Sequence, residues 1–302
     1  MSSKDLWLDV NDLVIRYRVR RSIDQQPRAR MLILPGFTEF VEKHVPTMAR
    51  LADIGLESLV LDWPGQGRST RLTDYADTLI HSDGFEQHLA CLNAVAGREG
   101  FTDDGGVPLF LLGHSMGGHL AMRQAAEYMP RCAGVVITAP MILPPVRPAG
   151  LVLMLAQMFC GIGFARYPVL FRDQTPRGLT FYPENNLTRD PEGYAVQPSW
   201  WARDPRLNGY GASFGWVRAA YASCLATTAN RDWMKRFPLP LAAHFAGDER
   251  IVDDATTRVM LPLVPEAEIH DYPDARHELL LELPEVREAL WQRIADFITA
   301  RC

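Results

Sequence analysis

Residues 107–118 read VPLFLLGHSMGG, an apolar run that ends in a Gly-x-Ser-x-Gly pattern. Residues 107–112 predict a buried strand, and residues 117–129 predict the helix that follows it. A Gly-x-Ser-x-Gly turn between a buried strand and a helix places its serine at the end of a parallel sheet, because the small glycines let the two backbones approach closely. The stretch therefore predicts an α/β fold with Ser115 as a candidate nucleophile.

The same pattern occurs a second time, as GASFG at residues 211–215. The residues before this copy, 203–210, are polar and turn-like, so no predicted strand can position Ser213. We therefore expect Ser213 to stand at the start of a helix and Ser115 to be the nucleophile. The alternative is that Ser115 has only a structural role in the turn.

Strands and helices alternate on both sides of Ser115, which is typical of a mostly parallel sheet with helices on both faces. Residues 13–19 alternate in polarity and predict an outer, antiparallel strand. Buried strands are expected at residues 30–34, 56–61, 133–138, 241–246 and 268–272, and further helices at 40–54, 84–96, 254–263 and 284–299.

The alternation stops between about residues 140 and 237, where the chain is rich in Pro, Gly and aromatic residues. We expect a sheet core made of residues 1–139 and 236–302, interrupted by a helical cap insertion at residues 140–235. The fold class expected is α/β, with the cap lying over one end of the sheet.

A serine nucleophile needs a base, and the base needs a carboxylate to orient it. In this architecture the acid and then the histidine follow the serine, each in a loop after a strand. Of the eight histidines, His277 alone falls in a loop directly after the last predicted strand. It is the predicted base.

The acid should follow the strand at 241–246, where Asp248 and Glu249 are the leading candidates. Such an acid commonly precedes one residue and then an apolar pair, and Glu249-Arg250-Ile251-Val252 has that spacing. We favour Glu249 and keep Asp248 as the alternative. Asp253 and Asp254 stand where they would cap the next helix.

Acyl transfer also needs two backbone N–H groups aimed at the developing oxyanion. The residue after the nucleophile, Met116, supplies one in this architecture. The other comes from the loop after an earlier strand, here the turn at residues 35–38, and we assign it to Phe37.

Composition excludes several other classes of protein. The chain has 302 residues, 47% of them hydrophobic, and a net charge of −5, which gives no support for nucleic-acid binding. Its five cysteines are widely spaced, and His277-Glu278 does not continue into a zinc-binding H-E-x-x-H pattern. We expect no metal ion and no organic cofactor. The N-terminus lacks the apolar core of a signal peptide, which predicts a cytoplasmic protein.

Residues 150–165 read GLVLMLAQMFCGIGFA, with Gln157 as the only polar side chain. The run is shorter than the roughly 20 residues that span a bilayer. We expect a buried or interfacial helix that lines an acyl tunnel or contacts a membrane surface transiently, with plain packing of the cap as the alternative.

Several segments resemble the lysophospholipase and monoacylglycerol lipase group of α/β-hydrolases, also described as S33-type serine aminopeptidases. They are GFTEFVEK at 36–43, DWPGQGRS at 62–69, GHSMGG at 113–118 and HELL at 277–280. The resemblance runs from about residue 10 to the C-terminus. It implies a cap that admits an acyl chain, with Ser115, His277 and Glu249 as the triad. The chain departs from many relatives in two places: it has Pro35-Gly36 where many have His-Gly at the oxyanion turn, and it offers Asp248-Glu249 where many have Asp as the acid, which leaves the acid open.

The leading hypothesis is a serine hydrolase that cleaves a small lipid-like ester, such as a lysophospholipid or a monoacylglycerol. An aminopeptidase, thioesterase or acyltransferase would use the same triad. A non-catalytic hydrolase fold kept as a binding module is the third hypothesis. The sequence does not indicate an oligomeric state.

Overall fold

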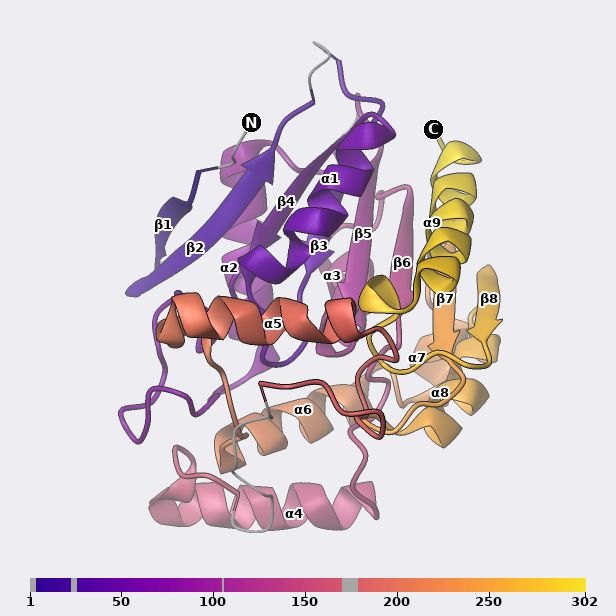
Figure 1. Cartoon of the computed structure of the whole chain (residues 1–302). Coiled ribbons are helices and arrows are strands. Elements are labelled where there is room, and N and C mark those ends of the chain that lie inside the picture. The colour runs from indigo at the N-terminus through magenta and orange to yellow at the C-terminus, as the bar shows by residue number, and fades with distance from the viewer. Residues whose placement is uncertain (1–3, 23–25, 105, 170–178) are drawn as a thin grey trace.

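The computed structural model describes residues 4–22, 26–104, 106–169 and 179–302. These residues form one eight-stranded sheet in the order β1-β2-β4-β3-β5-β6-β7-β8 (Figure 1). The strands are β1 Leu6–Val10, β2 Leu13–Arg20, β3 Ala29–Leu34, β4 Leu56–Leu61, β5 Leu109–His114, β6 Gly134–Thr138, β7 Leu241–Ala246 and β8 Ala267–Tyr272. Strand β2 pairs antiparallel with β1 and β4, and all other pairs are parallel. The mostly parallel sheet is therefore confirmed.

Two strand predictions need correction. Strand β1 was missed, so β2 is the second strand from the edge and not the outer one. The signal for β1 was present, because Leu6, Leu8 and Val10 are half-buried and alternate with exposed residues. Asn11 and Asp12 join β1 to β2 with φ angles of 46° and 65°, a backbone conformation that Asn and Asp tolerate in tight hairpins.

Strand β5 lies two residues later than predicted and ends at His114, directly before Ser115. The reason is pairing with β6, which continues through Gly113 opposite Ile137 and His114 opposite Thr138. All six residues of β5 are buried. The strand therefore extends as a rigid, fully paired element up to the candidate nucleophile.

Helices cover both faces of the sheet. Helices α1 Val45–Asp53 and α9 Pro284–Thr299 pack on one face, in front of the sheet in Figure 1. Helices α2 Phe85–Glu99 and α3 Met116–Tyr128 pack on the other. Each face has its own cluster of buried apolar side chains, so the sheet lies between two hydrophobic layers. This is the arrangement that parallel strands require.

The helix predicted at residues 40–54 is split. A short 3-10 turn, η1 Val41–His44, precedes α1. Pro46 explains the break, because a proline is accommodated in the first turn of a helix but not in its interior. The C-terminal end is as expected, since Gly55 follows α1 with a φ of 82°.

The segment between β6 and β7 contains helices and, among its described residues, no strand of the sheet. Its elements are α4 Ala149–Phe159, η2 Cys160–Phe164, α5 Pro191–Arg203, η3 Pro205–Leu207, α6 Phe214–Ala226 and α7 Arg231–Lys235. In Figure 1, α5, α6 and α4 lie beyond one end of the sheet, with α4 farthest from it. We call residues 140–235 the cap; its residues 170–178 lie outside the described part, and the exact domain limits stay a prediction.

After β7 the chain forms α8 Asp254–Met260 and η4 Leu261–Leu263, and η5 Leu279–Leu281 follows β8. Asp253 caps α8 by accepting the N–H of Thr256, as the sequence indicated. No helix among the described residues is long and apolar enough to cross a membrane.

Candidate active site

Ser115 lies in a strained turn between β5 and α3. Its φ of 54° and ψ of −120° are unusual for a residue with a side chain, a conformation that costs on the order of 1–3 kcal/mol. The neighbouring glycines make this turn possible: a Cβ on Gly117 would lie 1.8 Å from the Leu34 carbonyl oxygen, and one on Gly113 would lie 2.2 Å from the Gly117 oxygen. The close approach predicted from the Gly-x-Ser-x-Gly pattern is therefore present at Ser115.

His277 and Glu249 meet at the same end of the sheet. His277 follows β8, Glu249 follows β7, and the imidazole Nδ1 lies 2.8 Å from the Glu249 Oε2. Both side chains are at least 96% buried. The second carboxylate oxygen of Glu249 accepts the backbone N–H groups of Ile251 and Val252 at 2.7 and 3.2 Å. The carboxylate is thus held on one side by backbone and directs its other oxygen to the histidine.

This contact changes both pKa values. Burial lowers the pKa of His277, but the charge and hydrogen bond of Glu249, together with the charge of Glu278, raise it above its ordinary value. Burial raises the pKa of the Glu249 carboxyl, but His277 and the two backbone donors lower it by more. Near neutral pH, Glu249 is therefore ionised and stabilises a proton on His277.

Asp248, the alternative acid, faces different partners. Its oxygens lie 2.7 Å from the Arg250 Nε, 3.4 Å from the Arg276 Nε and 3.5 Å from a guanidinium nitrogen of Arg189. Among the described residues, Asp248 forms no hydrogen bond or ion pair with His277. Of the two carboxylates that the sequence left open, Glu249 is the one hydrogen-bonded to the histidine.

The turn after β3 lies directly against Ser115, since a Cβ on Gly36 would be 3.2 Å from the Ser115 Cβ. Within the described part of the chain, neither the Phe37 N–H nor the Met116 N–H has a hydrogen-bond acceptor in the protein. Met116 is the first residue of α3, where backbone N–H groups have no partner inside the helix. Both N–H groups are therefore available to an oxyanion.

A buried ionic cluster behind His277 was missed by the sequence analysis. Lys43 Nζ lies 2.5 Å from Glu39 Oε1 and 2.7 Å from Glu278 Oε1. The His114 ring contacts Glu278 at 3.4 Å and packs edge-on against the His277 ring, with centroids 4.9 Å apart. Burial lowers the pKa of His114 to about 4, so this ring is neutral near pH 7.

Ligand atoms of Glu39, His114 and Glu278 lie within 4.8 Å of one another, a spacing that would suit a metal ion. The Lys43 ammonium already contacts both carboxylates and supplies the positive charge that a metal would bring. The cation at the centre of this donor set is therefore the Lys43 ammonium.

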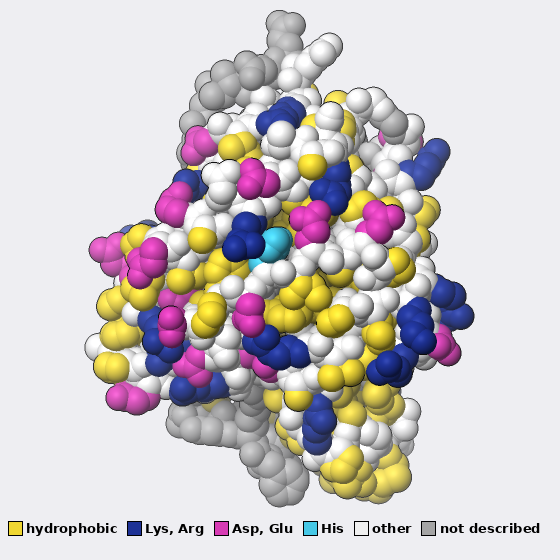
Figure 2. Space-filling model, turned by 90° about the vertical axis from the view of Figure 1, so that its right-hand side faces the viewer, with side chains coloured by type: hydrophobic (Ala, Val, Ile, Leu, Met, Phe, Trp, Pro, Cys, Tyr) yellow, Lys and Arg dark blue, Asp and Glu magenta, His cyan; other side chains and the backbone are white. Residues whose placement is uncertain are grey.

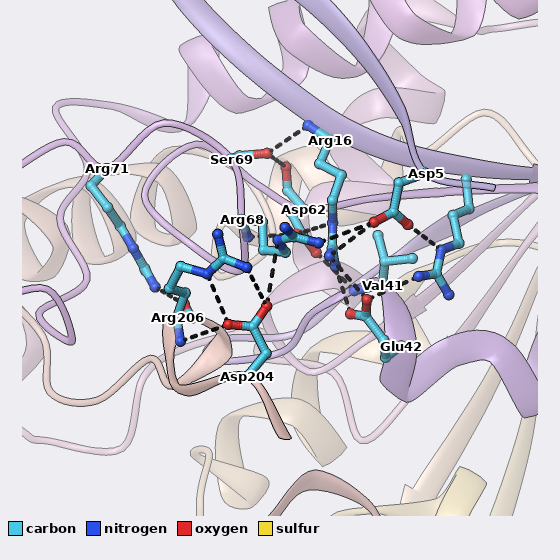
Figure 3. A network of polar contacts seen from close by, with 11 residues as sticks. Asp5, Arg16, Val41, Glu42, Asp62, Arg68, Ser69, Arg71, Asp204 and Arg206 are labelled. Atoms are coloured by element: carbon cyan, nitrogen blue, oxygen red, sulfur yellow. Dashed lines mark hydrogen bonds and ion pairs between the residues drawn. The ribbon is translucent and has the colours of Figure 1, made fainter. Parts of the chain in front are cut away.

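A second polar network ties the segment that follows the turn at residues 35–38 to the loop at residues 62–69 (Figure 3). Asp62 accepts the backbone N–H groups of Val41 and Arg68, each at 2.7 Å, and pairs with the buried Arg16 at 2.8 Å. Arg16 also binds Glu42 through two guanidinium nitrogens. The two sequence segments that carried the resemblance, 36–43 and 62–69, are thus tied together around one arginine.

Ser213, in the second Gly-x-Ser-x-Gly copy, is the N-cap of α6. Its hydroxyl accepts the Trp216 N–H at 3.0 Å and lies 2.8 Å from His81 Nδ1. His119 and His244 have partners of their own: Thr228 and Ser223 for His119, and Tyr272 for His244.

Comparison with known proteins identifies the family and the fold of the chain. A family model described as serine aminopeptidase, S33, matches residues 25–284. Lysophospholipase L2 of Escherichia coli (strain K12) is 27% identical over 305 residues, covering 95% of this chain and 85% of that protein. Monoglyceride lipase of Homo sapiens is 32% identical over 127 residues, covering 39% of this chain and 36% of that protein.

Among solved structures, a soluble variant of monoglyceride lipase from Saccharomyces cerevisiae in complex with a substrate analog is similar, with a TM-score of 0.78 at 17% identity. The match covers 100% of this chain and 97% of that chain. The similarity shows that the fold is that of the α/β-hydrolases.

Proposed function

Because the chain belongs to the serine aminopeptidase S33 family and has an α/β-hydrolase fold, we propose that it is a serine hydrolase that cleaves carboxylic esters. Ser115 is the nucleophile, His277 the general base and Glu249 the acid that orients the base. The observation that carries the proposal is the buried 2.8 Å contact between His277 Nδ1 and Glu249, made at the same end of the sheet as the strained Ser115 turn.

In the proposed reaction, His277 Nε2 removes the proton of the Ser115 hydroxyl as its oxygen attacks the ester carbonyl carbon. The Phe37 and Met116 N–H groups stabilise the oxyanion. His277 then gives its proton to the departing alcohol, which leaves an acyl-enzyme. Water attacks this ester with His277 again as base, and collapse of the second oxyanion releases the carboxylic acid and restores Ser115.

The proposed substrate is a small lipid-like monoester of the lysophospholipid or monoacylglycerol type. Two observations support this class: relatives with these activities in their names match the chain, and helices of the cap lie over the end of the sheet that carries Ser115 (Figure 1). The same triad could cleave an amide or a thioester, so substrates of these types belong in the test.

We also propose that the cap contacts a membrane surface transiently. From Ala149 to Ala165 the chain carries no charged residue, and apolar side chains of α4 and η2 are exposed: Leu151, Met154, Leu155, Met158, Ile162 and Phe164. We call these six residues the α4 patch. Figure 2 shows hydrophobic side chains gathered at the end of the molecule that α4 occupies in Figure 1. An apolar helix face without charge is suited to the interface of a bilayer.

The test is an activity screen with the purified protein and its Ser115→Ala variant. The substrates are lysophospholipids, monoacylglycerols, 4-nitrophenyl esters of graded chain length, and amino-acid 4-nitroanilides. We expect hydrolysis of medium- and long-chain esters, loss of that activity in the variant, and labelling of Ser115 by a fluorophosphonate. Full activity in Ser115→Ala would overturn the mechanism. Preference for the anilides would overturn the ester assignment.

A further inference from the structure

The turn that carries the proposed Phe37 oxyanion donor is held by side chains from two distant parts of the chain. Gln66 is 1% exposed. Its side-chain amide forms hydrogen bonds with the residues on both sides of Phe37. Its Nε2 donates to the Gly36 carbonyl at 3.1 Å, and its Oε1 accepts the Thr38 N–H at 3.1 Å. Rotation of either peptide plane next to Phe37 would break one of these bonds.

Thr38 needs such support, because its φ of 69° lies in the left-handed region that a β-branched residue seldom adopts. The Thr38 carbonyl accepts a hydrogen bond at 3.0 Å from Nε2 of Gln197, which is 95% buried and belongs to cap helix α5. The cap thus bonds directly to the residue after Phe37.

The loop that carries Gln66 makes further contacts with the turn and with the cap. Trp63 Nε1 donates to the Pro35 carbonyl at 2.8 Å. On the cap side, Arg68 pairs with Asp204 at 3.5 Å, and Arg71 donates to the Arg206 carbonyl at 2.5 Å (Figure 3). Asp204 and Arg206 lie just after α5. The cap therefore contacts both the turn at residues 35–38 and the loop that carries Gln66.

These contacts satisfy the backbone polar groups on either side of Phe37 and leave its own N–H without a protein partner. We propose that Gln66 and Gln197 are positioning residues for the Phe37 oxyanion donor, and that Gln197 makes the orientation of this donor depend on how the cap is docked. The inference rests on the proposed esterase function. Neither glutamine is required to touch the substrate.

The experiment compares Gln66→Leu, Gln197→Leu and the matched control Gln124→Leu. Gln124 is also fully buried, and its Nε2 donates to Asn93 at 2.6 Å, away from the turn. Two quantities are measured for each variant: kcat and KM on 4-nitrophenyl acetate, whose short acyl chain does not extend into the cap, and the inhibition constant of a phenylboronic acid. The boronate forms a tetrahedral adduct with the serine and places a negatively charged oxygen at the oxyanion site.

Loss of one oxyanion donor lowers kcat by about 100- to 1000-fold. A displaced donor should give a smaller effect, so we expect kcat to fall about 10- to 100-fold in both turn variants, with KM within about twofold. Boronate affinity should fall with kcat. The Gln124→Leu variant should keep both values within about twofold after correction for its folded fraction.

A purely structural role would lower the unfolding temperature of all three variants and leave kcat per folded molecule and boronate affinity unchanged, which would overturn the inference. An increase in KM alone would also overturn it, because it would indicate a substrate-binding role. Ser115→Ala distinguishes failure of the proposed function from failure of the positioning role. If that variant keeps its activity, the proposed function fails. If it is inactive while the turn variants match Gln124→Leu, only the positioning role fails.

Discussion

At the scale of single residues, neighbours in sequence have different surroundings. Asp248 and Glu249 are adjacent, yet one is paired with arginines at the surface and the other is buried against His277. Both residues lie in the turn and loop after β7, which direct the two side chains to different partners. The difference in role therefore follows from side-chain direction and not from the type of charge.

This difference can be tested by matched substitutions. Glu249→Gln keeps the size of the side chain but removes the charge that stabilises a protonated His277. We expect kcat/KM to fall by about 10³- to 10⁴-fold, the range typical of triad acids. Asp248→Asn should change kcat/KM by less than about threefold, as is usual for a surface substitution. Steady-state kinetics on one 4-nitrophenyl ester measures both, and equal losses would contradict the assignment of Glu249.

The raised pKa of His277 also predicts a pH profile. The base acts only when neutral, and a raised pKa keeps the ring protonated to higher pH, so the acid limb of kcat/KM should lie above the ordinary value of 6.5. Glu249→Gln removes the largest of the contributions that raise this pKa, and the limb should move to lower pH. Glu278 and Lys43 also face the ring, with raising and lowering effects. They are unchanged in the variant. An unmoved limb would contradict this account.

At the scale of elements, the Ser115 turn depends on the absence of side chains at its glycines. A Cβ on Gly117 would meet the backbone of β3, which cannot yield as a flexible side chain would. We expect Gly117→Ala to lower the free energy of unfolding by about 3–5 kcal/mol, or to prevent folding. The control is Gly97→Ala in α2, where an added Cβ meets nothing within 4 Å.

Gly97→Ala should stabilise the protein by about 0.5–1 kcal/mol, because alanine is the better helix former. Urea unfolding measures both changes. A Gly117→Ala variant within 1 kcal/mol of the parent would show that β3 and α3 can separate at little cost.

The ionic cluster behind His277 joins η1 to the loop after β8. Lys43→Met would remove the ammonium group from the buried Glu39 and Glu278 carboxylates and leave them the rings of His44 and His114 as partners. We expect the free energy of unfolding to fall by about 3–5 kcal/mol, the range for removing one partner of a buried ion pair. Lys235→Met, at an exposed position in α7, should change it by no more than about 0.5 kcal/mol. Equal stability of the two variants in urea would mean that the cluster relaxes or takes up protons.

At the scale of the whole molecule, the cap has a polar inner side and an apolar outer side. Its inner side, through Gln197 and Asp204, bonds to segments around the candidate site. Its outer side carries the exposed α4 patch, with Met154 at 55% and Met158 at 51% exposure. If the patch docks at a bilayer, the site and the lipid surface lie on the two sides of one small helical layer.

The membrane proposal predicts that Met154→Glu weakens binding to vesicles of phosphatidylcholine and phosphatidylglycerol by at least about tenfold, because a buried methionine contributes roughly 1.5–3 kcal/mol and a carboxylate is disfavoured there. Val259→Glu on α8 is the control, since Val259 is equally exposed at 57% but lies outside the patch. Vesicle co-sedimentation measures binding, and hydrolysis of a water-soluble short ester should be unchanged in both variants. Equal binding of both variants would exclude the patch as the docking surface.

The pattern of residues along the chain was sufficient to predict the parallel sheet, the strand–turn–helix at Ser115, the helix cap at Ser213 and the loop position of His277. Each of these depends on residues close together in sequence, where apolar periodicity and glycine spacing act directly on the backbone. The same reasoning missed β1, whose weak alternation is short, and misplaced the ends of β5, which are set by pairing with β6.

The contacts between distant segments were decided by the tertiary structure alone. The His277–Glu249 bond, the Lys43 cluster and the Gln66 and Gln197 bonds each join residues between 28 and 235 positions apart, except for the Lys43–Glu39 pair. Spacing in the sequence favoured Glu249 over Asp248, and the fold supplies the contact with His277. The type of residue decides its charge and hydrogen-bonding capacity, but the packing of the chain decides which partner it meets. The sequence determined where the proposed nucleophile and base would stand, and the fold determined which groups lie close to them.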